Sequence, residues 1–384
     1  MSALISTAPP SLAAVFAQHW PAYLAAHGAP ARSATHSVAG GRIPPQHRRA
    51  ARAIMHCRTA ELGCVFYRCN DCGRMEARPI SCGHRACNGC GQHKSLEWEA
   101  RQKARLLPVP YHMVTFTIPA EFRALFRSHQ ELCYDLLFRE SAAALSTFAA
   151  DPRHLGGHIG MTGVLQTWTR DLRYHPHIHY LVPGGAVKDD NQWIRPKNPG
   201  VLVPAIPLAV HMRNRMRAAL KAADFKLYLT LPSKAWKKPW NCDARPVGSG
   251  AKAMEYVARY VQKTALDAAR IIAISERGVS YKWTHRESGQ SRITTVTGHE
   301  FLRLFLQHVL PRGFRRVRHF GYLSAAAKER YERLRGLLKA GAIVLLLPEK
   351  TTVCCQACGQ AMTFLHALRH PHRARPPPIT VNTP

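Results

Sequence analysis

Short apolar runs with strand character alternate along the chain with stretches whose apolar residues recur at helical spacing. Tyr111–Pro119 is a β-prone run that ends at a proline, and Glu121–Ala150 follows the helical period. His158–Thr169 and Ile178–Val182 are further apolar runs, the second ending at Pro183-Gly184-Gly185. Runs rich in β-branched and aromatic residues that stop at Pro or Gly predict strands. Because only a short turn separates the last two strands, we expect them to pair antiparallel.

The pattern continues in the second half of the chain. It predicts a small hairpin through residue 193, helices over 208–223, 251–263, 299–309 and 329–339, and strands over 271–275, 279–284 and 292–297; a further helix is expected over 11–26. Residues 230–250 combine prolines with Trp236, Lys237, Lys238 and Trp240. This composition favours a loop that stacks unpaired bases and holds phosphates. A mobile linker is the alternative interpretation.

Two histidines stand at alternate positions in the strand that ends at Pro183. Side chains two apart on a strand share a face, so His177 and His179 project together while Ile178 and Tyr180 point the other way. Two such imidazoles can hold one divalent metal ion. The plainer alternative is a half-exposed strand in which histidine and apolar residues simply alternate.

Cysteines cluster between residues 57 and 90, and two Cys-x-x-Cys pairs stand out. Cys69/Cys72 and Cys87/Cys90 have the spacing of two knuckles of one tetrahedral zinc site. A redox-active pair is the alternative, but a glycine directly after each pair favours zinc. Arginines between these cysteines make the region a candidate DNA-docking module.

Further cysteines leave room for more zinc. A second ion is expected at Cys57 and Cys82, with a choice of partners that the sequence leaves open: Cys64, His47, His56 and His84. Near the C-terminus, Cys355 and Cys358 with His366 and His370 are candidates for another site. A Pro- and Arg-rich stretch, expected to be disordered, follows them.

The charge of the chain narrows the class of partner. Lys and Arg number 54 against 23 Asp and Glu, which gives a net charge of +31. Unpaired positive charge repels itself, so an excess this large points to a polyanion, with nucleic acid as the first candidate. No apolar run is long enough for a membrane span, and the N-terminus lacks a basic n-region. Clustered cysteines without an export signal place the protein in a reducing cytoplasm.

The predicted helix over 251–263 carries two tyrosines one turn apart. Tyr256 and Tyr260 are four residues apart and therefore lie on one face. Such a pair is more often a packing stripe, but Met254 and Val257 offer a separate apolar stripe for burial. Arg259 and Lys263, three residues after each tyrosine, are placed to contact a phosphate held there.

Taken together, these motifs resemble the two-tyrosine HUH transposases of rolling-circle insertion sequences, of the insertion-sequence ninety-one type. The resemblance extends from about residue 47 to residue 362 and rests on motifs in a fixed order: Cys57-Arg58-Thr59, Cys69/Cys72, Ser81-Cys82, Cys87/Cys90, Leu106–Tyr111, Thr167-Trp168, His175-Pro176-His177-Ile178-His179, Tyr256-x-x-x-Tyr260 and His299-Glu300-Phe301. It implies an α+β fold with an antiparallel palm sheet and helices on one side. The two histidines would lie on a central strand, with the tyrosine helix nearby.

The resemblance also implies the chemistry. His177, His179 and a third group would hold Mg²⁺ or Mn²⁺, and Tyr256 and Tyr260 would attack DNA to give 5′-phosphotyrosines. Relatives often have His before Thr167-Trp168, where this chain has Gln166. Gln166 is therefore offered as the third ligand. Gln262 is less suitable, because helical geometry places it off the helix face that carries Tyr256 and Tyr260. A second departure is Gly83-His84-Arg85-Ala86, where relatives usually have an Asn-Arg-His pattern.

The predicted organisation has four parts: a partly helical segment over 1–45, a zinc-binding DNA-docking domain over 46–100, an HUH catalytic domain over 105–340, and a Cys/His and Pro/Arg-rich tail over 341–384. The expected partners are single-stranded transposon ends and target DNA, in the cytoplasm and at the nucleoid. The sequence leaves open whether the chain forms a homo-oligomer. Two other classes compete with a transposase: a histidine-triad nucleotide hydrolase, suggested by His175-x-His177-x-His179, and a non-catalytic zinc-dependent DNA-binding protein.

Overall fold

A five-stranded antiparallel sheet lies at the centre of the computed structural model, which describes residues 10–27, 43–261, 265–285, 287–349 and 352–369. The strand order is β12-β4-β5-β3-β8. The strands are β3 (Tyr111–Thr117), β4 (Gly160–Trp168), β5 (Tyr174–Pro183), β8 (Asn241–Pro246) and β12 (Val317–Gly321). The expected α+β class and the antiparallel pairing of β4 with β5 are confirmed, and β5 is the middle strand.

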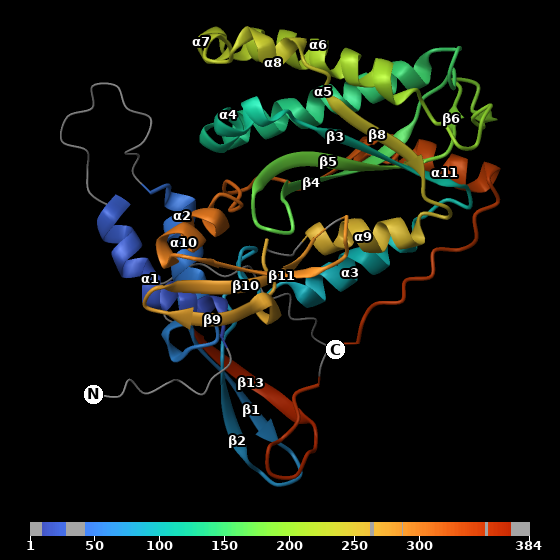
Figure 1. The fold of residues 1–384 in the computed structure, drawn as a ribbon. Helices are drawn as coiled ribbons and strands as arrows, with labels where there is room; N and C mark the ends of the chain where they lie inside the picture. The colour runs from blue at the N-terminus through green and yellow to red at the C-terminus, as the bar shows by residue number, and fades with distance from the viewer. Residues whose placement is uncertain (1–9, 28–42, 262–264, 286, 350–351, 370–384) are drawn as a thin grey trace.

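Helices cover one face of this sheet and bury its largest hydrophobic core (Figure 1). They are α4 (Arg123–Ser128), α5 (Gln130–Ala150), α6 (Ala205–Ala223), α7 (Phe225–Leu229) and α8 (Ser233–Lys237). Ile178 and Tyr180 of β5 are fully buried here, and the Tyr180 hydroxyl lies 2.7 Å from Oγ of Ser141. This packing fixes the position of β5 from the helix-covered face of the sheet.

The region expected to be a base-stacking loop is part of this core instead. Trp236 and Trp240 stack on each other with ring centroids 6.0 Å apart, and both pack edge-on against Phe122. They are 6% and 7% exposed. The base-stacking prediction and the linker alternative are both wrong. The two large aromatic side chains stabilise the fold by being buried in the core, which leaves them unable to stack on bases.

Helix α9 (Ala251–Val261) lies against the other face of the sheet, and α3 (Gln92–Lys103) packs alongside α9 (Figure 1). Met254 and Val257 of α9 are buried against Val164 and Leu181 of the sheet. The sheet therefore has helices on both faces, whereas the family resemblance implied one.

A second core packs against the turn between β4 and β5. It is built from α1 (Leu12–His27), α2 (Pro45–Met55), α10 (Gly298–Leu306) and the sheet β9 (Ile271–Ser275), β10 (Gly278–Thr284) and β11 (Ser291–Val296). Trp168 and Leu172 belong to this core and support the turn. The predicted first helix and the three predicted strands are confirmed.

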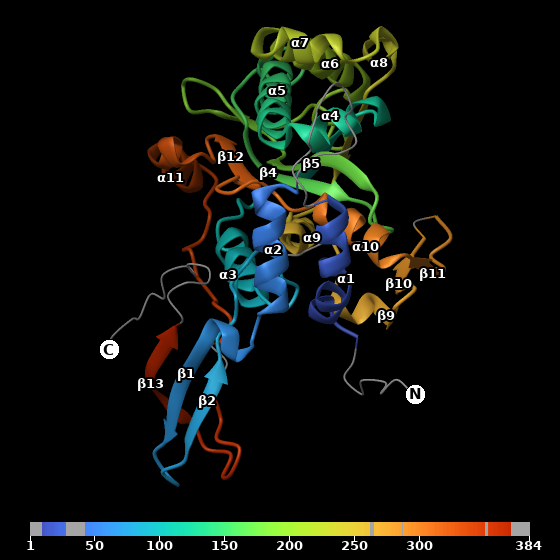
Figure 2. The ribbon, with the colours of Figure 1, turned by 90° about the vertical axis from the view of Figure 1, so that its left-hand side faces the viewer.

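An elongated three-stranded sheet projects from the rest of the molecule (Figure 2). It consists of β1 (Gly63–Cys69), β2 (Met75–Pro79) and β13 (Met362–Arg369). Strand β13 pairs antiparallel with β1, from Gly63 opposite Arg369 to Cys69 opposite Met362. Segments from near the two ends of the chain thus share one sheet.

The remaining elements are the hairpin β6 (Ala186–Val187) and β7 (Trp193–Ile194), the helix α11 (Lys328–Leu337), and short 3-10 helices over 60–62, 120–122, 268–270 and 325–327. The predicted hairpin and helix are confirmed. Residues 28–42 of the N-terminal segment lie outside the described residues. So do Gln262, Lys263 and the Pro- and Arg-rich stretch from His370. Within the part of the chain that is described, every helix is too short or too polar to cross a lipid bilayer.

Candidate active site

The two histidines of β5 project from the sheet face that carries α9. Their ring centroids are 4.7 Å apart and the ring planes are nearly perpendicular, at 89°. His177 is 8% exposed and His179 is 6% exposed, so both imidazoles are shielded from bulk water. Because Ile178 and Tyr180 are anchored on the opposite face, the strand cannot rotate to release either histidine.

Hydrogen bonds fix the orientation of both rings. Nδ1 of His177 donates to the backbone oxygen of His175 at 2.7 Å. Nδ1 of His179 lies 2.9 Å from Oγ1 of Thr115, which stands directly opposite on β3. With Nδ1 engaged in each ring, Nε2 is the nitrogen that each can offer to a metal ion. Metal-binding histidines commonly have such a second hydrogen bond.

Gln166 brings an oxygen to the same place from the neighbouring strand. It lies opposite His177 in the β4–β5 register, and its Oε1 is 3.1 Å from Nε2 of His179. Its amide nitrogen donates to the backbone oxygen of Trp168 at 2.9 Å, which turns the oxygen toward the histidines. The structure therefore brings together the three side chains that the sequence proposed as ligands.

This donor set fits a divalent cation. Adjacent ligands of an octahedral ion with bonds of about 2.1 Å lie about 3 Å apart, close to the separation of Nε2 of His179 and Oε1 of Gln166. Imidazole nitrogens and an amide oxygen are ligands that suit Mn²⁺ or softer ions. Mg²⁺ is also a candidate for this site, because its availability offsets its weaker preference for imidazole. The three residues thus have the chemistry to hold one ion, and His179 and Gln166 have the spacing of two adjacent ligands.

Helix α9 places Tyr256 against this histidine pair. The phenol ring meets the His179 ring edge-on, with centroids 5.5 Å apart and planes at 80°. Tyr256 is 37% exposed, whereas Val257 is fully buried beneath the helix. The separate apolar stripe expected from the sequence is therefore the packed face, and Tyr256 is not sealed in the core. Tyr260 follows one turn later in α9.

A cleft of about 640 Å³ opens beside Gln166, between α3, α9 and the end of β4. Glu255 and Arg259, which flank Tyr256 in the sequence of α9, line it as well. Its other lining residues are Asn88, Cys90, Gly91, Gln92, Ser95, Leu96, Glu99, Trp168, Arg170, Ala265, Asp267 and Arg270. Gln166 of the candidate ligand set and Cys90 of the cysteine region therefore line the same cleft.

The other predicted DNA contacts lie across the sheet. Lys237 and Lys238 are exposed at the end of α8, and Lys238 forms an ion pair with Glu121. Asn241, three residues later, is opposite Thr117 of β3, which is itself opposite His177. The lysines therefore lie near the histidine end of the sheet.

Sequence reasoning missed Thr115, Arg170 and Arg270. Thr115 has no local signal, because only the strand register brings it to His179. The two arginines line the cleft but cannot be distinguished by sequence from the other cations of a chain with 54 of them.

Comparisons with known proteins agree with this geometry. Residues 160–330 match the family model described as "Putative transposase", and residues 15–118 match the transposase zinc-binding domain. A Sinorhizobium fredii protein, "Putative transposase y4qJ", is 34% identical over 83% of this chain and 82% of its own length. The chain belongs to the IS91-type transposases.

A more distant relative of this transposase is the "Transposase for insertion sequence element IS801" of Pseudomonas savastanoi. It is 27% identical over 71% of this chain and 68% of its own length. No solved structure matches the chain. Membership of a transposase family implies a DNA-binding enzyme that breaks and joins DNA strands.

The zinc-binding domain of the transposase gathers four cysteines: Cys57, Cys82, Cys87 and Cys90. Sγ of Cys90 lies 3.4 Å from that of Cys57 and 3.6 Å from that of Cys82. A tetrahedral zinc site with four thiolates needs ligands this close, so the group suits a structural zinc. Neither Cys64 nor any of the three histidines considered from the sequence belongs to this group.

The expectation that Cys69/Cys72 and Cys87/Cys90 share one ion is wrong. The β1–β2 hairpin carries Cys69 and Cys72 to its tip and leaves Cys87 and Cys90 beyond its base; a strand of this length spans about 20 Å. Cys69 and Cys72 group instead with Cys355 and Cys358.

The expected histidine ligands of the tail are also corrected. His366 lies in β13 and stacks on Phe66 with ring centroids 4.7 Å apart. His370 lies outside the described residues.

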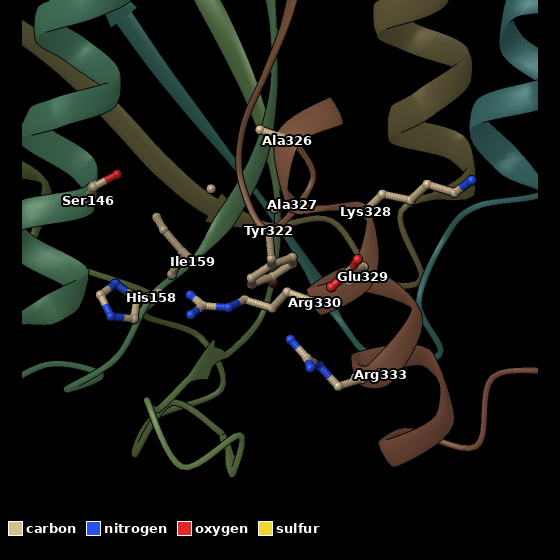
Figure 3. Close-up of a pocket in the computed structure, with 11 residues that line it drawn as sticks. Ser146, His158, Ile159, Tyr322, Ala326, Ala327, Lys328, Glu329, Arg330 and Arg333 are labelled. Carbon is tan, nitrogen blue, oxygen red and sulfur yellow. The ribbon is translucent and has the colours of Figure 1, made fainter.

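A second cavity of about 730 Å³ lies at the other end of the central sheet, between α5, α11, the end of β12 and the residues just before β4 (Figure 3). Arg330, Arg333 and His158 surround it, and Tyr322 lines its inner wall. Neither Gln166 nor any residue of α9 lines it, although it is larger than the cleft beside Gln166. Chemistry rather than size therefore identifies the candidate active site of the transposase.

Proposed function

We propose that this transposase cleaves and rejoins single-stranded DNA at transposon ends through 5′-phosphotyrosine intermediates on Tyr256 and Tyr260. The observation that carries the proposal is the edge-on contact of the accessible Tyr256 ring with His179. A phenol beside an oriented histidine pair and an amide oxygen is an arrangement suited to phosphodiester transfer.

His177, His179 and Gln166 would hold Mg²⁺ or Mn²⁺ at this site. When bound, such an ion polarises a non-bridging oxygen of the scissile phosphate and stabilises the charge that develops there. Thr115 and the backbone of His175 keep the two imidazoles oriented for that role.

In the first step, the phenol oxygen of Tyr256 forms a bond to phosphorus and the bond from phosphorus to the 3′ oxygen breaks. The phenol proton passes to solvent, which reaches this half-exposed side chain, and the departing 3′ oxygen takes up a proton as a free 3′-OH. A free phenol with its pKa near 10 is a weak nucleophile at neutral pH, so cationic side chains at the cleft must favour the phenolate. Arg259 lines that cleft.

The reverse step joins strands without another energy source, because the phosphotyrosine ester conserves the energy of the broken bond. A 3′-OH attacks phosphorus and releases the tyrosine. With Tyr260 one turn from Tyr256, a second strand can be cleaved while the first stays attached, as rolling-circle transfer requires. The expected setting is DNA in the cytoplasm, at the nucleoid.

The test is covalent capture. The full chain is incubated with Mn²⁺ and a 5′-labelled or 3′-labelled oligonucleotide carrying a terminus of the element, and then denatured. We expect an adduct that retains the label on the 3′ side of the cut, and phosphopeptide mapping to Tyr256 or Tyr260. Tyr256→Phe with Tyr260→Phe should abolish the adduct. Tyr228→Phe, on the opposite face of the sheet, is the matched control and should keep it.

Three outcomes contradict the proposal in different ways. An adduct that survives the double substitution excludes these tyrosines as the nucleophiles. Turnover of nucleotides without an adduct favours the histidine-triad hydrolase. DNA binding with neither reaction leaves a zinc-dependent binding protein.

A further inference from the structure

The second cysteine group joins segments from near opposite ends of the chain. Cys69 and Cys72 lie at the turn after β1, and Cys355 and Cys358 lie in the loop before β13. The Sγ atoms of Cys69 and Cys358 are 3.5 Å apart, those of Cys72 and Cys355 3.7 Å, and those of Cys72 and Cys358 3.6 Å. All four ligand atoms lie within 4.8 Å of one another.

These separations fit a bound ion better than a covalent pair. A disulfide would bring two sulfurs to about 2 Å, and all four cysteines are free thiols. Four thiolates around one zinc, with bonds of about 2.3 Å at tetrahedral angles, lie about 3.8 Å apart. The group therefore has the identity and spacing of a tetrahedral zinc site.

The two Cys-x-x-Cys pairs have the same turn geometry. Gly73 donates to the backbone oxygen of Cys69 at 3.0 Å, and Gly359 donates to that of Cys355 at 2.9 Å. Both glycines have positive φ, 72° and 75°, which a residue with a side chain adopts only with strain. Two such knuckles facing each other are the usual construction of a four-cysteine zinc site.

Contacts around the group hold the second knuckle against the first. Glu76 of β2 accepts a hydrogen bond from the backbone nitrogen of Gln356 at 2.8 Å, and Arg78 donates to the backbone oxygen of Cys354 at 2.8 Å. Strand β13 extends the same contact along the whole of β1. The site is thus supported by the sheet on one side and by β2 on the other.

We propose that Cys69, Cys72, Cys355 and Cys358 bind one zinc ion, separate from the ion at Cys57, Cys82, Cys87 and Cys90, and that this ion ties the C-terminal segment to the β1–β2 hairpin. The two family models match residues 15–118 and 160–330, so the second knuckle lies beyond both. The zinc-binding module of this chain is therefore built from both ends and is completed only when residues 352–369 are present. The inference does not depend on the tyrosine chemistry.

Metal content of the full chain tests this inference. The protein is purified, dialysed against a weak chelator, and its zinc measured by mass spectrometry. We expect two zinc ions per wild-type chain and one in Cys355→Ser with Cys358→Ser. Cys354→Ser is the matched control, because this exposed neighbouring thiol belongs to neither group, and it should keep two. Cys358→His, which preserves a ligand, should also keep two.

Cobalt gives a second measurement on the same proteins. Replacement of zinc by Co²⁺ should give charge-transfer and visible bands for two four-thiolate sites, halved in the double serine variant and shifted in Cys358→His. One zinc in the wild type, or two in the double serine variant, would overturn the proposal. Loss of both ions from that variant would also overturn it, since the two sites would then not be separate.

Discussion

Thr115 helps to set the orientation of His179. Its hydroxyl is 2.9 Å from Nδ1 of His179. A hydrogen bond at the far nitrogen holds a metal-binding imidazole in one tautomer and raises its basicity. The affinity of the candidate site for a metal ion therefore depends partly on a residue that would not contact the ion.

We predict that Thr115→Val weakens binding of Mn²⁺ about 10- to 100-fold without unfolding the protein. Valine keeps the volume of threonine but removes the hydroxyl. Isothermal titration with Mn²⁺ measures the effect directly. Thr117→Val, on the same face of the same strand, is the control and should bind Mn²⁺ as the wild type does. Equal affinities for the wild type and Thr115→Val would show that the hydroxyl is irrelevant.

His308 provides a pH-dependent contribution to stability at the residue scale. Burial lowers its pKa to about 3, and Arg316 nearby acts in the same direction. Its Nδ1 faces Oγ1 of Thr167 at 3.2 Å, and Nε2 donates to the backbone oxygen of Leu172 at 3.0 Å. Because the folded state keeps this imidazole neutral while the unfolded chain protonates it near pH 6.5, the stability contribution is complete above about pH 6.5 and is lost as pH falls toward 3.

We predict that wild-type protein loses about 2 kcal/mol more unfolding free energy between pH 7 and pH 5 than His308→Gln does. Glutamine can replace the hydrogen bonds but takes up no proton. Urea denaturation of both proteins at the two pH values measures the difference. Parallel losses in the two proteins would exclude His308 as a source of acid sensitivity.

The residue scale is also where sequence reasoning was both strongest and weakest. The alternation around Ile178 identified which histidines share a face, because strand geometry alone decides it. Gln166 was identified from a family pattern, and the structure brings its oxygen to His179. Thr115 could not be predicted, because its contact depends on which strand lies beside β5.

At the scale of elements, α9 is positioned by its apolar face. Val257 is fully buried against the sheet, and Tyr256, the next residue back, points toward His179. The distance between phenol and histidines is therefore fixed by helix packing. The periodicity of apolar residues predicts where helices and strands occur. It does not predict the strand order β12-β4-β5-β3-β8, because pairing between distant segments leaves no local pattern in the sequence.

We predict that Val257→Ala lowers the unfolding free energy by about 2 kcal/mol, because it leaves a cavity under α9. The rate of adduct formation should fall as well, since Tyr256 loses its fixed distance from His179. Denaturant unfolding and a single-turnover capture assay measure the two effects. Lys252→Ala, exposed on the same helix, should change neither. A destabilised but fully active Val257→Ala would show that helix position does not limit the reaction.

At the scale of the whole molecule, the net charge of +31 predicts binding to DNA that weakens steeply with salt. The cations are not equivalent, however. Arg259 lines the cleft and Lys238 lies near the histidine end of the sheet, whereas Arg153 lies beyond the far end of α5. Lys238 and Arg153 each form an ion pair, with Glu121 and Asp151 respectively.

We predict that Arg259→Ala and Lys238→Ala each reduce the slope of log affinity against log salt by about 1 for a single-stranded oligonucleotide. Each would remove one phosphate contact. Fluorescence anisotropy between low and moderate salt measures the slope. Arg153→Ala is the control and should leave this slope unchanged. A change of equal size in all three variants would mean that the oligonucleotide follows no defined path on the protein surface.

Pairing between the chain's distant ends could not be predicted at this scale. The sequence predicts that Cys355 and Cys358 are metal ligands, but it points to the nearby His366 and His370 as their partners. Nothing local in residues 355–369 indicates that they pair with β1, which lies about 300 residues earlier in the chain.

That pairing has a consequence for synthesis on the ribosome. Strand β1 emerges early, but β13, which covers its open edge, is translated only after the central sheet is complete. Until then the nascent hairpin exposes unpaired backbone groups on β1, and such edges recruit strands of neighbouring chains. The time spent making the middle of the protein is therefore the interval in which this transposase is most vulnerable to aggregation.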